Sequence, residues 1–457
     1  MDETSQPLEL LLTVTRDGSR TLGAQIEDGL RQAIRGGALK AGAEVPSTRD
    51  LARQLGISRR IAVDAYSQLA AEGYLSLRQG ARPHVAETPI SDGATATHER
   101  AETLPLYDFR PAMPDVAAFP RSAWLRSVRE AMRSITDYDL GYGDPRGMEA
   151  LRSGLAGYFG RVRGVVADPA RIVITSGYSQ GLNVVCQALA GARRIAIEDP
   201  SNLLQREIAA RAGLEVVKAR VDGDGIVVDE LPPADAVVVT PAHQHPTGVL
   251  LSPERRAALI GWLRDHDAVA IEDDYDAEFR YDRPAVGALQ GLDPERVIYA
   301  GSVSKTLAPA LRLGWLVVPS ALVDRVTAEK MLADRGTSRI DQLAFADFLA
   351  RGELDRHLRR MRTRYRARRD ALVEAVTEFL PEAEILGIAA GLHATVRLDV
   401  DEDALRAEAA ERRIAFETMR DYDAGDGTLL LGYAPLPEPT IRAGIAELSR
   451  LPGIRRR

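Results

Sequence analysis

The stretch GSVSKTLAPALR, residues 301–312, is the part of the sequence from which the rest of the chain can best be interpreted. It follows an apolar run, so it is expected to form the loop after a buried strand. A lysine in a dry, partly electropositive loop can lose its proton and form a Schiff base with an aldehyde, and Lys305 is one of four lysines in the chain. Ser302, Ser304 and Arg312 could hold a phosphate beside it. Taken alone, the pattern more often marks a surface lysine in a serine-rich turn.

Short apolar runs recur on both sides of this loop, with helical stretches between them. Buried strands that alternate with helices are typical of a mostly parallel sheet in an α/β domain. The predicted strands are Arg171–Ser176, Arg194–Glu198, Glu215–Val221, Ala236–Thr240, Ala268–Glu272, Val297–Ala300 and Leu313–Val318. The sequence therefore predicts a mostly parallel seven-stranded sheet, followed by a long charged helix and a small α+β C-terminal subdomain.

An acidic cluster, Glu272-Asp273-Asp274-Tyr275, ends another of these strands. Open α/β sheets bind ligands beyond the carboxyl ends of their strands. A carboxylate such as Asp273 could pair there with a protonated pyridine nitrogen and make the ring an electron sink. On its own, the cluster is more typical of acidic residues that favour a helix N-terminus.

Two further turns follow predicted strands. Gly177, Tyr178 and Ser179 occupy a strand-to-helix turn, and the free N–H groups of a helix N-terminus suit a phosphate. A tight turn with a capping serine explains the same residues equally well. His243 lies in the Pro- and Gly-rich turn at residues 240–248, where it could simply be the partner of a loop carbonyl.

The composition is that of a globular protein, 45% hydrophobic and 27% charged, with a net charge of −7. Its 457 residues exceed one ordinary core of about 100–200 residues, which predicts two or three domains. No apolar stretch approaches the roughly 18 residues of a membrane span. The single cysteine, Cys186, excludes an intramolecular disulfide and a multi-cysteine zinc site. We therefore expect a cytoplasmic protein without a membrane partner or a metal.

The N-terminal segment has a different charge balance, because residues 16–85 hold eleven Lys/Arg against seven Asp/Glu. Thr21, Ser47 and Ser58 are candidate N-caps of three successive helices, and two strand-like runs then flank a short turn. This layout predicts a winged helix-turn-helix. The side chains expected to contact DNA are Arg49, Ser58, Arg59, Arg60, Arg78 and Arg82. The alternative is a solvated arginine face.

The order of the motifs in the large domain resembles fold-type I pyridoxal-phosphate aminotransferases. It comprises a phosphate turn, a Pro-Thr-Gly loop, an Asp…Tyr pair, then Ser-x-Ser-Lys and an arginine. The resemblance implies that Lys305 forms the Schiff base with pyridoxal 5'-phosphate, that Asp273 pairs with the pyridine nitrogen and that Tyr275 lies near the ring hydroxyl. His243 is also placed at the cofactor. The implied phosphate ligands are Gly177, Tyr178, Ser179, Ser302, Ser304 and Arg312.

Tyr142, in the stretch GYGDPRG, matches the tyrosine that crosses the dimer to the cofactor phosphate in these enzymes. The resemblance therefore also implies a homodimer.

The stretch VPSTRDLARQLGISRRIAVDAYSQLAAEGYL, residues 45–75, resembles the GntR-type winged helix. Its fusion to an aminotransferase-like domain looks like the MocR/GabR family of bacterial transcription regulators. We expect a DNA-binding domain at 1–86, a linker at 87–105 and an effector-binding and dimerisation domain at 106–457. The implied function is a regulator that binds an operator with two half-sites and senses the cofactor or a cofactor–amine adduct. Control of vitamin B6 or amino-compound metabolism is a physiological hypothesis.

Three positions depart from the aminotransferase pattern. Leu430 stands where the enzymes usually carry the arginine that clamps the substrate carboxylate, Asn202 where many have an aromatic residue, and His245 replaces the Asn of Asn-Pro-Thr-Gly. An apolar side chain cannot replace a bidentate arginine. We therefore expect neither efficient transamination nor a simple α-amino acid effector, although an active aminotransferase with an appended helix-turn-helix remains the alternative. Arg110 and Arg206 could contact an anion from elsewhere, but surface salt bridges are their expected role.

Overall fold

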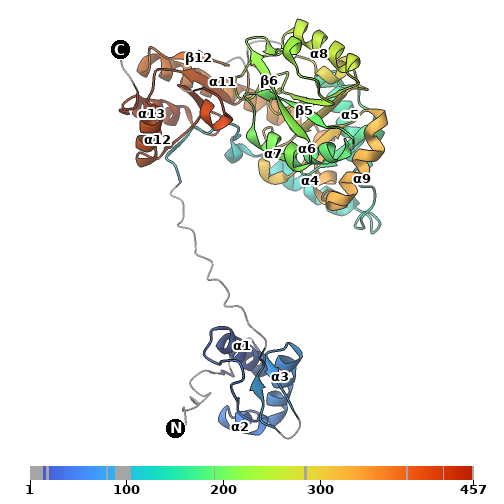
Figure 1. Ribbon diagram of the computed structural model, residues 1–457, viewed down its shortest axis with the longest axis vertical. Helices are drawn as coiled ribbons and strands as arrows, with labels where there is room; N and C mark the ends of the chain where they lie inside the picture. Colours follow the sequence, from blue (N-terminus) through green and yellow to red (C-terminus); the bar gives the residue numbers. More distant parts are fainter. Residues whose placement is uncertain are drawn as a thin grey trace. The chain divides into compact units, whose positions relative to one another are not determined.

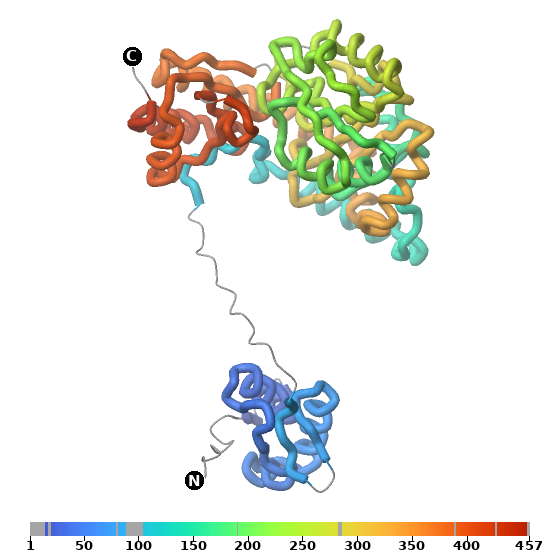
Figure 2. Tube along the Cα trace, in the orientation of Figure 1, coloured from blue at the N-terminus to red at the C-terminus, as the bar shows by residue number. Residues whose placement is uncertain are grey.

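A computed structural model of the chain forms two compact units, Met1–Glu102 and Thr103–Arg457 (Figures 1 and 2). The residues that the structure describes are 14–16, 20–78, 81–87, 104–189, 191–281, 286–387, 390–425 and 427–454. The linker predicted at residues 87–105 lies largely outside these ranges, as do residues 79 and 80 of the predicted wing turn.

The first unit is a three-helix domain with a small β-hairpin. Its elements are α1 (Leu22–Arg35), α2 (Thr48–Gln54), α3 (Arg59–Ala71), β1 (Leu75–Ser76) and β2 (His84–Val85), and the two strands pair antiparallel. Each predicted capping residue, Thr21, Ser47 and Ser58, accepts a hydrogen bond from a backbone N–H of the first helical turn. The caps satisfy donors that a helix start leaves free, so each helix begins where the sequence predicts.

The large domain is built on one twisted sheet, and the described residues form it with eight strands. Their order is β4 (Ile172–Thr175), β11 (Gly314–Val317), β10 (Val297–Ser302), β9 (Val269–Asp273), β8 (Ala236–Val239), β5 (Arg194–Asp199), β6 (Glu215–Asp222) and β7 (Gly225–Ile226). The neighbours from β10 to β6 are parallel, whereas β11 runs antiparallel to both β10 and β4.

The predicted strand number needs one correction. All seven predicted strands are present, and the eighth is β7, which pairs antiparallel with β6 in a tight hairpin. A strand of two residues has no hydrophobic period, so its sequence carries no signal that a pattern analysis could detect.

Helices cover both faces of this sheet. Along β5, Ile195 and Ile197 belong to the core under α6 (Tyr178–Ala188) and α7 (Leu203–Arg211), whereas Ala196 belongs to the core under α8 (Pro253–Asp265). This alternation follows from the two-residue period of a strand. The remaining helices of the domain are α4 (Arg121–Ser134), α5 (Glu149–Arg163), α9 (Val323–Asp334) and α10 (Arg339–Ala350).

The C-terminal subdomain stands beside the large sheet (Figure 1). The long helix α11 (Glu353–Phe379) leads into an antiparallel sheet of β12 (Glu384–Leu386), β13 (His393–Arg397), β16 (Thr428–Gly432) and β15 (Glu417–Thr418), with helices α12 (Glu402–Glu411) and α13 (Glu438–Leu448). The first strand of the unit, β3 (Tyr107–Asp108), pairs in parallel with β14 (Ile414–Ala415). The subdomain is α+β, as predicted. Among the described helices none is long and apolar enough to cross a membrane.

Candidate functional site

A cavity of about 270 Å³ opens beyond the carboxyl ends of the central strands. Its lining residues are Ala112, Tyr178, Ser179, Glu198, Ser201, Asn202, Gln205, Thr240, His245, Asp273, Tyr275, Ser302, Ser304, Lys305, Pro309 and Arg312. Loops that follow β4, β5, β8, β9 and β10 all contribute, because parallel strands end at the same edge of a sheet. Eight of the predicted cofactor ligands meet in this one cavity.

Lys305 lies in the turn just after β10, with its Nζ atom inside the cavity. Nζ donates a hydrogen bond to the carbonyl oxygen of Ala112 at 2.5 Å. Burial lowers the pKa of Lys305 below its usual value, and the carboxylate of Asp273, first among nearby acidic groups, opposes the shift. An amine with a lowered pKa is neutral more often, and the neutral amine is the form that attacks an aldehyde.

Asp273 is the last residue of β9 and lies at the deep end of the cavity. Its Oδ2 atom accepts a hydrogen bond from Nε2 of Gln205 at 3.1 Å, and the same Nε2 lies 3.1 Å from the hydroxyl of Tyr178. Burial, reinforced by the neighbouring Asp274, raises the pKa of Asp273 well above its usual value. A buried carboxylate without an ion-pair partner among the described residues is suited to bind a cationic group.

The N-terminus of α6 forms an anion-binding end of the cavity. No side chain of the described chain caps this helix, so N–H groups of its first turn lack a capping acceptor. Gly177, with φ of 118°, lies so close to the Arg312 guanidinium that a β-carbon on it would be 3.2 Å from Nη2. No carboxylate among the described residues pairs with Arg312, so its charge faces the cavity together with the helix N-terminus.

Tyr275, His243 and Asp276 form a hydrogen-bonded chain at the side of the cavity. The Tyr275 hydroxyl lies 2.9 Å from Nδ1 of His243, and the same Nδ1 lies 2.9 Å from Oδ2 of Asp276. Tyr275 lines the cavity, whereas His243 lies behind Tyr275 and is not among the lining residues. The cofactor-binding role of His243 stays a prediction.

Tyr142 does not lie in this cavity. Its side chain is 73% exposed, under the guanidinium of Arg335, which lies 5.0 Å from the ring centroid. Within one chain it is therefore separate from the other predicted ligands, and a role at the phosphate would require a partner subunit.

Sequence reasoning missed four polar residues that line the cavity, namely Glu198, Ser201, Gln205 and Thr240. Glu198 is the last residue but one of β5, and its Oε2 atom accepts hydrogen bonds from the backbone N–H and the hydroxyl of Thr240, at 3.1 and 2.6 Å. Burial raises the pKa of Glu198 to about 7. Glu198 and Thr240 could have been found, because each stands at the carboxyl end of a predicted strand, whereas Gln205 lies in α7 and its sequence carries no such signal.

Leu430, which replaces the substrate-binding arginine, and the two arginines that could have contacted an anion instead are all held by neighbouring side chains. Leu430 is fully buried in β16 against Met419 and Tyr422. Arg110 pairs with Asp108 at 2.6 Å, so it is held in a salt bridge, as expected. Arg206 is likewise held by two aspartates of its own unit.

The predicted DNA-contacting side chains lie on the surface of the first unit. Arg59 and Arg60 are the first two residues of α3, and Ser58 caps it. Arg60 lies 3.9 Å from Asp64 and Arg82 lies 3.2 Å from Glu44, in exposed pairs of little energetic weight. All six predicted residues, Arg49, Ser58, Arg59, Arg60, Arg78 and Arg82, are exposed. The guanidinium groups of Arg60 and Arg82 can therefore exchange these weak partners for DNA.

Two family descriptions match the chain. Residues 22–85 match "Bacterial regulatory proteins, gntR family", and residues 118–424 match "Aminotransferase class I and II". The HTH-type pyridoxine biosynthesis transcriptional regulator PdxR of Corynebacterium glutamicum is 31% identical, over 94% of this chain and 95% of its own. The probable rhizopine catabolism regulatory protein MocR of Rhizobium meliloti is 32% identical, over 96% and 95%.

Solved aminotransferases share the fold of the large domain. The kynurenine aminotransferase of Pyrococcus horikoshii, in complex with PMP and its substrates and products, is 25% identical with a TM-score of 0.70, over 78% of this chain and 95% of that chain. The multiple substrate aminotransferase of Thermococcus profundus is 25% identical with a TM-score of 0.69, over 77% and 91%.

A GntR winged helix joined to a class I/II aminotransferase fold defines a class of helix-turn-helix transcription regulators. The chain belongs to the MocR-type family of that class. The relatives span nearly the whole chain, so the regulator interpretation prevails over that of an aminotransferase with an appended helix-turn-helix.

Proposed function

We propose that this chain is a transcription regulator whose DNA binding responds to pyridoxal phosphate, or to the cofactor together with an amine. The observation that carries the proposal is the single cavity that brings together Lys305, Asp273, Arg312 and the uncapped N-terminus of α6. The proposed domains are a DNA-binding domain at 1–86, a linker at 87–105 and an effector domain at 106–457.

The residues present fit the cofactor at both of its ends. Arg312 and the first-turn N–H groups of α6 would hold the phosphate, with Gly177 leaving room beside the guanidinium. Ser179, Ser302 and Ser304 would add hydroxyl groups at the same end. When bound, the cofactor would supply an aldehyde that captures an amine and a pyridine ring that withdraws electrons from it.

The other side chains have separate tasks at the ring. Asp273 would hold a proton on the pyridine nitrogen, and Gln205 would keep its carboxylate oriented through the 3.1 Å hydrogen bond. Tyr275 would lie near the ring hydroxyl, with His243 behind it. Lys305 would provide the amine that binds the aldehyde.

We further propose a homodimer in which Tyr142 reaches the phosphate of the partner subunit. Tyr142 is exposed, and so are Tyr138, Leu140 and Leu332, at 81%, 61% and 80%. Leu140 and Tyr142 line one surface hollow together with Arg335, the C-cap residue of α9. Large exposed apolar side chains that cluster on one surface are typical of an interface.

A dimer would bring two winged helices to one operator in the cytoplasm. Two linked modules bind paired half-sites more tightly than one, provided that the linker spans the gap, so we propose an operator with two half-sites. The relatives are named for pyridoxine biosynthesis and for rhizopine catabolism. Control of vitamin B6 or of amino-compound metabolism is therefore the proposed physiological role, with residual half-transamination as a side activity.

The test compares DNA binding with and without the cofactor. Gel shifts with apo and cofactor-loaded protein on the same operator fragment, at one fixed salt concentration, should give different affinities or footprints, because a ligand shifts a conformational equilibrium only when it binds the two states differently. Sedimentation should show a dimer. Identical affinities and footprints for the two forms would contradict the proposed sensing role.

A further inference from the structure

The first turn of α7 forms an exposed part of the cavity wall. Asn202 caps this helix by accepting a hydrogen bond from the backbone N–H of Leu204 at 3.0 Å, and it lines the cavity although it is exposed to solvent. Gln205, three residues later, lines the cavity as well. The cavity therefore opens to solvent beside α7, and contacts that hold this helix also hold the edge of the opening.

A cluster of four charged residues ties α7 to the small subdomain. Arg206 of α7 pairs with Asp199 at the end of β5, at 2.5 Å, and with Asp423 of the small subdomain, at 3.4 Å. Lys218 of β6 pairs with Asp423 at 2.9 Å and with Asp199 at 3.5 Å, so each cation lies between the two carboxylates. The hydrogen bond between Lys218 and Asp423 raises the pKa of the lysine and lowers that of the aspartate, so both are charged at neutral pH. We call these four residues the Asp423 cluster.

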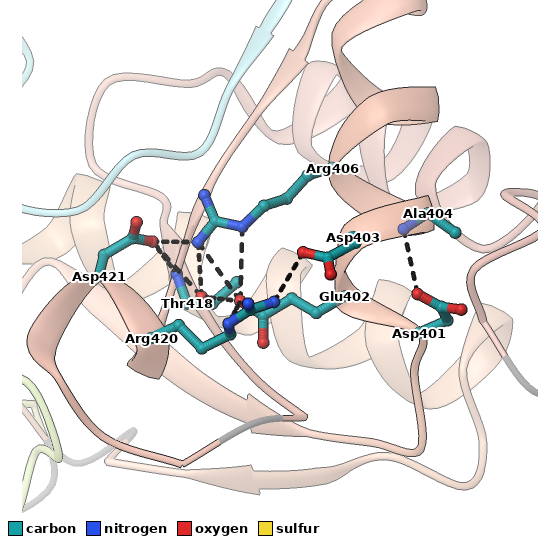
Figure 3. A network of polar contacts seen from close by, with 8 residues as sticks. All are labelled: Asp401, Glu402, Asp403, Ala404, Arg406, Thr418, Arg420 and Asp421. Atoms are coloured by element: carbon teal, nitrogen blue, oxygen red, sulfur yellow. Dashed lines mark hydrogen bonds and ion pairs between the residues drawn. The ribbon is translucent and has the colours of Figure 1, made fainter.

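A polar network holds the segment that leads to Asp423 (Figure 3). Arg406 of α12 donates to the Thr418 hydroxyl at 2.6 Å and pairs with Asp421. The backbone N–H of Thr418 donates to Asp421 at 2.8 Å, which closes a capping box. Because its own subdomain holds this segment, Asp423 ties that subdomain, and not only a loop, to α7.

The contacts between the large domain and the small subdomain include two kinds. Some are buried and uncharged: the backbone N–H of Gly391 donates to the carbonyl oxygen of Phe279 at 2.8 Å, and its own carbonyl oxygen accepts from the Tyr281 hydroxyl at 2.7 Å. The Asp423 cluster, in contrast, reaches the solvent, because the side chains of Asp423 and Lys218 are 62% and 53% exposed. Salt screens exposed charges far more than it weakens buried contacts, so high salt should loosen the cluster and leave the contacts at Gly391 in place.

We propose that the Asp423 cluster is a clasp that holds the cavity opening closed and limits how fast the cofactor enters and leaves. The proposal rests on the proposed function, because it takes the cavity to hold pyridoxal phosphate. None of the four residues is among the described residues that line the cavity, so the clasp acts on the opening and not on the ligand. Tyr422, next to Asp423, meets the ring of the lining residue His245 edge-on, with centroids 5.1 Å apart. Loss of the clasp would free this contact together with the start of α7, and binding and release would both become faster.

The test measures how fast pyridoxamine phosphate binds to and leaves the full-length apo protein, by stopped-flow fluorescence. This probe has no aldehyde, so its release requires no covalent bond to break. Asp423→Asn removes the charge, and asparagine tolerates the left-handed backbone of residue 423, with φ of 60°. Association and release should both become about fivefold faster, the factor that an exposed ion pair can contribute, while the dissociation constant should stay within about twofold.

Asp403→Asn is the matched control. Asp403 is an exposed carboxylate that pairs with Arg420 at 2.8 Å inside the small subdomain (Figure 3), so this variant should keep the wild-type rates. Lys218→Gln removes the second exposed charge of the clasp and should speed exchange as Asp423→Asn does. Raising the salt from about 0.1 to 1 M, where the screening length falls to about 3 Å, should speed exchange more in the wild type and the control than in Asp423→Asn. Thermal melting should show that all three variants fold.

The outcomes separate the clasp from the proposed function. If the wild type binds neither pyridoxal phosphate nor pyridoxamine phosphate, the proposed function fails and the clasp with it. If it binds them, but Asp423→Asn and Lys218→Gln exchange the probe at the wild-type rate, the clasp alone is overturned. Faster release without faster association, or the same acceleration in Asp403→Asn, would also overturn it, because either result indicates a general loosening of the fold.

Discussion

Asp273 and Asp274 are adjacent carboxylates with opposite expected roles, and exchanging each for asparagine provides a strong test of the proposed site. Asp273 faces the cavity, where its Oδ2 accepts a hydrogen bond from Gln205. Asp274 lies outside the cavity, where its Oδ2 accepts hydrogen bonds from Nε of Arg163 at 2.8 Å and from the Tyr299 hydroxyl at 2.6 Å. Asparagine preserves the size of both side chains, removes the charge and replaces one acceptor oxygen by an NH2 donor.

Asp273→Asn should weaken cofactor binding without weakening the apo fold. Removing one partner of a buried charge pair costs about 3–5 kcal/mol, which corresponds to a loss of affinity of roughly 150- to 5000-fold. The apo protein should be at least as stable as wild type. A carboxyl whose pKa is raised on folding stabilises the fold below its unfolded pKa, and that contribution is lost as the pH rises through the folded pKa.

Asp274→Asn is the matched control with the opposite expectation. Its side chain and that of Arg163 are 1% and 2% exposed, so the substitution leaves a buried guanidinium without its counter-charge. The free energy of unfolding should fall by about 3–5 kcal/mol. Cofactor affinity should change little at temperatures where the variant is folded, because this carboxylate does not line the cavity.

Two measurements on the apo proteins test whether Asp273 binds the cofactor and Asp274 stabilises the fold. Titration with pyridoxal phosphate, followed by visible absorbance, gives the affinity, and urea unfolding followed by circular dichroism gives the stability. The assignment would be refuted if Asp273→Asn bound the cofactor like wild type, or if Asp274→Asn lost more cofactor affinity than Asp273→Asn.

Three further predictions concern other parts of the chain. Lys305→Ala should abolish the visible band of the bound cofactor, and borohydride reduction with peptide mapping of the wild type should label Lys305; a label on another lysine would contradict the assignment. The double variant Arg59→Ala, Arg60→Ala should lose roughly 1–3 kcal/mol of operator binding for each base contact removed, and gel shifts at wild-type strength would rule out this placement. Burial raises the pKa of Glu198 to about 7. The unfolding free energy of the wild type should therefore fall by about 3 kcal/mol relative to that of Glu198→Gln as the pH rises from about 4.5 to 7. Urea unfolding across this pH range measures both, and the same pH dependence in the two proteins would contradict the prediction.

Local patterns in the sequence were sufficient for much of the fold and for the central site residues. Caps at Thr21, Ser47 and Ser58 predicted the three helices of the first unit, because a capping side chain bonds to its own helix and needs no distant partner. Seven of the eight strands that the described residues form in the large sheet were equally predictable from buried apolar runs. Lys305 and Asp273 could be placed at one site because the parallel strands β9 and β10 bring their carboxyl ends to one edge of the sheet.

Only the tertiary structure decided which side of each strand faces the cavity and what lies opposite it. The residue type and the local pattern do not distinguish Asp273 from Asp274, and only the resemblance to aminotransferases singled out Asp273. Neighbouring residues point to opposite faces, and the packing of α5 determines which face is the core. Glu417 and Leu430 are adjacent through the register of β15 and β16 alone. Register depends on contacts between segments far apart in the chain, so no local pattern in the sequence could show it.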